Sequence, residues 1–125
     1  MNAIFTSNPI VIVEKPWGRE EWIVNTAFYC CKKLFVLEGH RLSVQYHNLK
    51  DETLYLESGV ASVVLYDTLA LSECREVPLD HQSSLRILPG TIHRIIAHKD
   101  SWIIEASTQH RDSDVHRLQD DHGRV

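Results

Sequence analysis

The sequence is poor in several features that would place it in a special class of protein. It contains only three cysteines, Cys30, Cys31 and Cys74, and two of them are neighbours. An odd number of cysteines at this spacing does not form a disulfide framework, so we expect a reducing, cytoplasmic environment. No apolar run approaches the roughly 20 residues of a membrane span, and the N-terminus lacks the basic start and long apolar stretch of a signal peptide.

Basic residues are also few, and they do not cluster. The 13 Lys and Arg against 17 Asp and Glu give a formal net charge of −4, with the eight histidines counted as neutral. A mildly acidic chain without a basic tract has no electrostatic reason to bind nucleic acid or an anionic membrane, so we expect neither as a partner.

Internal repeats, low-complexity segments and linkers rich in Ser, Pro or Gly are missing as well. The 125 residues therefore predict one domain that spans residues 1–125, with residues 1–9 as a flexible N-terminus.

What the sequence does contain is a succession of short runs of β-branched and aromatic residues, separated by Gly, Pro, Asn and Asp. This pattern predicts an all-β fold, an antiparallel sandwich or barrel. No window shows a helical apolar stripe, although residues 112–121 can form a short helical turn. The predicted strands are 10–13, 21–24, 28–37, 41–47, 53–57, 60–66, 85–88, 93–97 and 102–107.

The segment 41–47 alternates strictly, with polar residues at odd positions and apolar residues at even positions. In a strand, Gln45 and His47 then project side by side from one face. A polar face usually meets solvent, but a barrel that holds a ligand inside produces the same pattern. On this face, Arg41 either shares the cavity or pairs with a nearby acid at the barrel mouth.

Two turns bring further candidate metal ligands toward His47. Glu52 follows His47 by five residues, so a hairpin at 48–51 would return it to the neighbourhood of the imidazole. His93 lies three residues after Pro89-Gly90, at the mouth of another predicted hairpin. With Gln45, these residues form a sulfur-free donor set that suits zinc, manganese, iron or cobalt. The alternative is that each histidine is simply a surface residue or a hydrogen-bonded core residue.

The spacing of these residues resembles two motifs of the cupin family. The first motif is similar to Gly39-x5-Gln45-x-His47-x4-Glu52-x6-Gly59, and the second to residues 85–93. The resemblance implies a double-stranded β-barrel, or jelly roll, and a homodimer. The chain departs from the family at three points, which are Gln45 in place of His, the adjacent Pro89 and Gly90, and Ala97 in place of Asn.

A narrower resemblance links residues 13–20, 41–47 and 114–124 to the cupin domain of mannose-6-phosphate isomerases. It implies an aldose–ketose isomerase of a sugar phosphate that depends on one divalent metal. The expected pair is mannose 6-phosphate and fructose 6-phosphate. Because these isomerases hold zinc with Gln, His, Glu and His, the resemblance assigns Gln45, His47, Glu52 and His93 as ligands and favours zinc over manganese, iron, cobalt or nickel.

Thr53 and His122 replace residues that are usual in the isomerases, so other functions stay open. The alternatives are a non-catalytic cupin that binds a metal or a sugar, and another metal-dependent enzyme such as an epimerase, a lyase or a dioxygenase.

The resemblance also suggests residues that contact the substrate. Arg117 matches an active-site Arg and would meet the phosphate or the enediolate, unless it pairs at the surface with an acid. Lys32 would assist phosphate binding or proton transfer, unless it is a solvated strand residue, and Arg41 would also bind substrate. The resemblance does not identify the catalytic base. Glu105, on the last predicted strand, is a candidate. The alternative is that Glu105 is a buried or rim acid paired with an Arg.

The remaining histidines have no ligand-like spacing and are predicted to lie at the surface. The strongly polar run 111–114 is predicted to be a solvated face or the start of a helix. The histidines in question are His40, His81, His98, His110, His116 and His122.

Overall fold

The computed structural model describes residues 2–4 and 10–125, and most of the N-terminal segment 1–9 that we expect to be flexible lies outside the described residues. The described part of the chain folds into strands and one 3₁₀ turn, without an α-helix. The elements are β1 (Val11–Lys15), β2 (Gly18–Asn25), β3 (Cys30–Val36), β4 (Val44–Tyr46), β5 (Glu52–Ser58), β6 (Ala61–Tyr66), β7 (Cys74–Pro78), β8 (Ser84–Ile87), β9 (Ile92–Ala97), β10 (Ser101–Ser107), η1 (Asp112–Asp114) and β11 (His116–Gln119).

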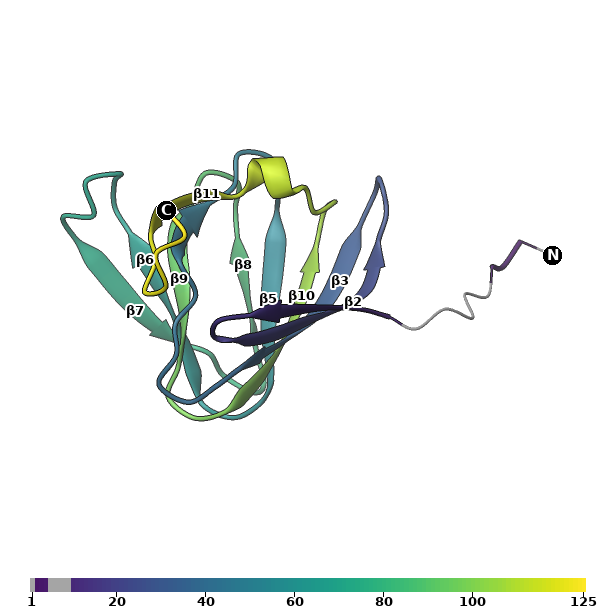
Figure 1. Cartoon of the computed structure of the whole chain (residues 1–125), viewed down its shortest axis with the longest axis horizontal. Coiled ribbons are helices and arrows are strands. Elements are labelled where there is room, and N and C mark those ends of the chain that lie inside the picture. The colour runs from purple at the N-terminus through teal and green to yellow at the C-terminus, as the bar shows by residue number, and fades with distance from the viewer. Residues whose placement is uncertain (1, 5–9) are drawn as a thin grey trace.

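The strands form two antiparallel sheets that face each other (Figure 1). The first sheet has the order β1-β2-β3-β10-β5-β8, and the second has the order β11-β4-β9-β6-β7. Alternate residues of the strands point inward, so that Leu34, Leu54 and Ile103 from one sheet share a core with Val63 and Ile95 from the other. The all-β prediction is confirmed. Because the chain passes repeatedly from one sheet to the other, side chains from both sheets lie around one interior.

Two strands were not predicted, for different reasons. β7 is an edge strand whose residues are mostly exposed, and its sequence, Cys-Arg-Glu-Val-Pro, does not alternate between apolar and polar residues. The segment 112–121 is helical only over η1, whereas β11 is extended and pairs with β4. This segment lacks an apolar helical face, and its backbone groups gain ladder hydrogen bonds from β4 instead.

The strand predicted at 41–47 is shorter than expected. β4 covers only Val44–Tyr46, and Arg41 makes an isolated bridge with Ile96. As a result Leu42 and Ser43 are both buried, and the strict alternation of faces fails at the start of the segment.

The three cysteines are free thiols, as their number and spacing predicted. None of the described residues belongs to a helix that could span a membrane.

Candidate metal centre

A cavity of about 220 Å³ lies between the two sheets, and Asp112 of η1 and Arg117 of β11 are among the residues that line it. Its walls come from the β1–β2 hairpin, β3, β4, β5, β9, β10 and the C-terminal segment. Its volume is below the roughly 300–1,000 Å³ typical of pockets for drug-sized ligands, so the cavity suits a small metabolite.

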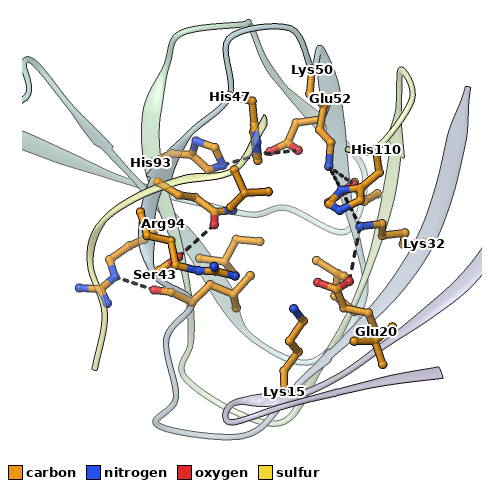
Figure 2. A pocket seen from close by; sticks show the side chains of 18 of the residues that line it. Lys15, Glu20, Lys32, Ser43, His47, Lys50, Glu52, His93, Arg94 and His110 are labelled. Carbon is orange, nitrogen blue, oxygen red and sulfur yellow. Dashed lines mark hydrogen bonds and ion pairs between the residues drawn. The ribbon is translucent and has the colours of Figure 1, made fainter. Parts of the chain in front are cut away.

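His47, Glu52 and His93 converge on one side of this cavity (Figure 2). The Nε2 atom of His93 lies 3.0 Å from Oε1 of Glu52, and the Nε2 atom of His47 lies 3.8 Å from Oε2. Their potential ligand atoms all lie within 4.8 Å of one another, and the three residues are buried. Two imidazoles and a carboxylate at this separation can hold one divalent cation.

Backbone carbonyls fix the orientation of both imidazoles. The Nδ1 atom of His47 is 2.9 Å from the carbonyl oxygen of Asp114, and the Nδ1 atom of His93 is 2.9 Å from that of Thr91. When each Nδ1–H donates to its carbonyl, Nε2 is the atom presented to the cavity. Metal-binding histidines are generally held in this way, so the residues fit a metal ligand set.

Burial and mutual contact control the protonation of these groups. Desolvation lowers the pKa of His47 to about 4, so its imidazole is neutral at physiological pH. Burial disfavours the charged forms of Glu52 and His93, but the hydrogen bond between them outweighs this effect. The pKa of Glu52 is therefore lowered and that of His93 is raised. A cation bound here would compete with a proton for the Nε2 atom of His93.

Gln45, the fourth ligand that the resemblance implies, lines the same cavity and lies directly opposite His93 in the β4–β9 pairing. Its side-chain oxygen accepts a hydrogen bond of 2.9 Å from the hydroxyl of Ser43. An amide oxygen has a second lone pair, so this hydrogen bond leaves one acceptor position on Gln45.

Asp114 holds the loop that carries the ligands, although its polar run was predicted to face solvent. The residue is buried, and its carboxylate accepts hydrogen bonds from the backbone N–H groups of Asn48 at 2.8 Å, Leu49 at 3.2 Å and Lys50 at 3.0 Å. Because its carbonyl also orients His47, Asp114 fixes both the loop and one ligand. The partners lie more than 60 positions away, so no local pattern reveals this role.

A second group of buried charges lies beside the candidate ligands and centres on His110. The Nδ1 atom of His110 is 3.0 Å from the ammonium of Lys32 and 2.9 Å from that of Lys50. Lys50 also forms an ion pair of 3.2 Å with Glu105, and Lys32 one of 3.4 Å with Glu20. The prediction that His110 lies at the surface is wrong, because the ring lines the cavity with its Nδ1 atom between the two lysines, while its Nε2 atom lies 2.9 Å from the carboxylate of Asp112 (Figure 2).

Glu105 and Lys32, both predicted as site residues, line the cavity and are buried. Burial raises the pKa of Glu105, and the negative charge of Glu52 adds to the effect. Lys50 is a site residue that the sequence did not single out. A lysine beside a turn is normally solvated, and the side chain is buried here because Glu105 supplies the opposite charge.

The two predicted arginines differ in position. Arg117 lines the cavity, and its buried Nε atom has no hydrogen-bond partner among the described residues. Arg41 is not part of the cavity wall, since its guanidinium binds Asp121 bidentately at 2.8 and 2.7 Å and is partly exposed. Arg41 therefore adopts the alternative that pairs it with an acid, because the chain at 41–43 does not continue the face of β4.

The facing sheets, with the His/Glu/His group between them, define the protein as a cupin. The chain belongs to the family described as mannose-6-phosphate isomerase C-terminal, whose model matches residues 8–120. A comparison of the sequence with curated proteins gives no match.

Solved structures with the same fold share little sequence with the chain. The capsular polysaccharide assembling protein CapF from Staphylococcus aureus matches with a TM-score of 0.77 at 18% identity, over 91% of this chain and 33% of its own. KdgF from Halomonas sp. matches with a TM-score of 0.66 at 17% identity, over 86% of this chain and 98% of its own. A variant of Bacillus subtilis oxalate decarboxylase matches with a TM-score of 0.75 at 14% identity, over 98% of this chain and 36% of its own. The chain thus spans about a third of the CapF and oxalate decarboxylase chains, and these similarities establish the fold.

Proposed function

We propose that the protein is a metal-dependent aldose–ketose isomerase of a phosphorylated sugar, with mannose 6-phosphate and fructose 6-phosphate as the first candidates. The proposal rests on one observation, that three kinds of functional group line the same small cavity. A His/Glu/His ligand group, a buried carboxylate and an arginine without a partner among the described residues all line it. Membership of the isomerase family supports the same assignment.

The metal would be held by His47, Glu52 and His93, with Gln45 as the proposed fourth ligand. A divalent cation bound there supplies Lewis acidity that polarises the sugar carbonyl. The donors do not distinguish among zinc, manganese, iron, cobalt and nickel, and the resemblance favours zinc. The remaining steps fall to side chains of the chain itself.

Isomerisation moves a proton between C1 and C2, so the cavity must contain a base and a group that stabilises negative charge. We assign the base to Glu105, whose raised pKa brings it closer to the operating pH. Lys50, 3.2 Å from the Glu105 carboxylate, orients this group and adds positive charge beside it. Arg117, on β11, is the proposed cation for the substrate, and Lys32 adds positive charge to the cavity from β3 in the other sheet.

The test is an assay of purified protein with a panel of aldose and ketose phosphates, with and without added zinc or manganese. We expect interconversion of one pair, lost on chelation and restored by metal. Absence of turnover with every sugar phosphate and every metal would contradict the proposal and favour a cupin that binds without catalysis. Oxygen consumption with ferrous iron would instead indicate a dioxygenase.

A further inference from the structure

The ring of His110 is in contact with charged groups at both of its nitrogens. Its Nδ1 atom lies inside the cavity, 3.0 Å from the ammonium of Lys32 and 2.9 Å from that of Lys50 (Figure 2). Its Nε2 atom lies 2.9 Å from a carboxylate oxygen of Asp112. The imidazole side chain is 10% exposed and that of Asp112 is 96% exposed, so the ring stands between two buried lysines and a carboxylate in solvent.

These partners determine which nitrogen of His110 carries the hydrogen. An ammonium can only donate, so Nδ1 accepts and carries no hydrogen, whereas a carboxylate can only accept, so Nε2 carries the hydrogen and donates it to Asp112. Burial and the positive charges of the two lysines lower the pKa of His110, and the hydrogen bond from the ring lowers the pKa of Asp112. The imidazole is therefore neutral near physiological pH, and the carboxylate is ionised.

The same contacts lead inward to Glu105, the proposed base. Its carboxylate lies 3.2 Å from the ammonium of Lys50, and its side chain is only 9% exposed. A buried base exchanges its proton with water slowly unless donors and acceptors connect it to solvent. Lys50, His110 and Asp112 provide such a connection, in which each group is in contact with the next.

We infer that His110 and Asp112 form a proton outlet, through which the proton taken up by Glu105 exchanges with solvent. This deepens and rests on the proposed function, in which Glu105 is the base. An imidazole suits the role because it accepts a proton at one nitrogen while it releases one from the other. Both residues of the outlet act through Glu105 and not on the substrate itself.

Each step of the exchange conserves protons and charge. The protonated carboxyl of Glu105 gives its proton to the nitrogen of Lys50 as that ammonium releases another proton to Nδ1 of His110. Lys50 is thus an ammonium before and after the step. The ring gives its Nε2 proton to the carboxylate of Asp112, which passes it to water. The reverse sequence restores the ring and returns a proton from solvent, which suffices because isomerisation neither produces nor consumes a proton overall.

Exchange of the Lys50 ammonium hydrogens with solvent tests the outlet without any need for turnover. It can be measured by nuclear magnetic resonance of the full chain with isotopically labelled lysine, where the Lys50 signal is the one lost in Lys50→Arg. Asp112→Asn and His110→Phe should each slow this exchange about threefold or more, because neither new side chain takes up a proton.

The matched control is Asp80→Asn, which alters an exposed aspartate that does not line the cavity and should exchange like the wild type. Thermal melting identifies any variant that fails to fold. Because the side chain of Asp112 is exposed, Asp112→Asn should fold even if His110→Phe does not.

A second measurement uses the isomerase reaction itself, run in heavy water. The product made by Asp112→Asn should contain less deuterium per turnover than the wild-type product, by about threefold or more, because slower exchange leaves the substrate's own hydrogen on Glu105 until it is returned. This ratio reports how the proton divides between return and exchange. A merely structural role of Asp112 would change the rate of turnover but not the ratio.

The outcomes separate the outlet from the proposed function. Lys50 exchange that is equal to the wild type, or faster, in either variant that folds would overturn the outlet even if the protein proves to be an isomerase. Equal deuterium content in the products of the wild type and Asp112→Asn would overturn it as well. Slower Lys50 exchange in a protein that converts none of the sugar phosphates would support the outlet and refute only the isomerase.

Discussion

The Nε2 atom of His93 lies 3.0 Å from Oε1 of Glu52, although the two residues belong to different sheets. Glu52 begins β5 in the six-stranded sheet, and His93 lies in β9 of the five-stranded sheet. The two sheets are thus joined at this point by a polar contact inside the barrel. A cation held here would tie them together, so metal binding and stability should be linked.

The first prediction concerns the ligands themselves. His47→Ala and His93→Ala should each lose most of the bound metal after dialysis, since changes even to the partners of ligands typically cost about 10–100-fold in affinity. Both variants should also lose the rise in melting temperature that added metal gives to the wild type. His98→Ala is the control, because that partly exposed residue pairs with Glu76 away from the cavity. Equal metal content in all three variants would show that the site is misassigned.

The role of Glu105 predicts a loss of activity without loss of metal. Glu105→Gln keeps the size of the side chain but removes the group that accepts the proton, so kcat should fall by about two to four orders of magnitude. Metal analysis should give the wild-type content, because Glu105 is not one of the ligands. Glu57→Gln on the outer face of β5 is the matched control and should retain full activity. A Glu105→Gln variant with wild-type kcat would exclude this residue as the base.

Asp114 predicts a dependence of stability on pH. Burial raises its pKa, but the three backbone N–H donors outweigh this effect and hold the pKa below the ordinary value of 3.8. A depressed carboxyl pKa contributes stability that is present above the unfolded-state pKa and is lost as the pH falls through the lower, folded-state pKa. Asp114→Asn should therefore lower the unfolding free energy at pH 7 by about 1.5–3 kcal/mol, the typical contribution of hydrogen bonds to a charged group.

Chemical denaturation of both proteins between pH 2.5 and 7 provides the measurement. The difference between wild type and Asp114→Asn should be constant near neutrality. It should shrink below about pH 4, where the carboxyl of the unfolded state begins to protonate while the native carboxylate is still ionised, and it should be lost once the native carboxylate is protonated as well. A difference that is independent of pH down to 2.5 would contradict this role of the charge.

The hairpin that carries Lys15 depends on a glycine. Gly18 has φ = +149°, and a Cβ atom there would overlap the backbone carbonyl of Phe35 on β3. Gly18→Ala should therefore lower stability by about 2 kcal/mol or more, through strain and steric conflict together. Gly39→Ala separates the two causes, because Gly39 has φ = +75° but open space around the new methyl group. If both substitutions cost the same, the overlap with Phe35 has no energetic effect.

The predicted homodimer can be tested at the edge of the larger sheet. β1 is an edge strand, and its residues Val11 and Ile12 are more than half exposed. Exposed apolar edges are sites where a second chain adds, so light scattering at micromolar concentration should give a dimer. Ile12→Lys should shift the protein toward monomer, and Val60→Lys in the β5–β6 turn should not. A monomeric wild type would refute the prediction.

Part of the candidate centre was predictable because it depends on local geometry. Gln45 and His47, two residues apart, both line the cavity, as the alternation of their segment predicted. The hairpins predicted at 48–51 and at Pro89-Gly90 do not form, because β4 and β9 lie in the five-stranded sheet and β5 and β8 in the six-stranded sheet. Glu52 and His93 still meet His47, because the chain crosses between the two sheets at these turns and the sheets face each other. The all-β fold also followed from local geometry, since short runs of β-branched residues between turn residues are a property of neighbouring positions.

The tertiary structure alone decided which charges lie inside. His110 looked like a surface residue, but its Nδ1 atom lies inside the cavity, 3.0 Å from the ammonium of Lys32 on β3 and 2.9 Å from that of Lys50 in the loop before β5. Arg41 was predicted on the same strand face as Gln45 and His47, but its side chain lies outside the cavity and binds Asp121, which is 80 positions away in the sequence. Burial of a charge depends on whether folding brings an opposite charge or an acceptor to it, and partners distant in sequence leave no trace in the local pattern.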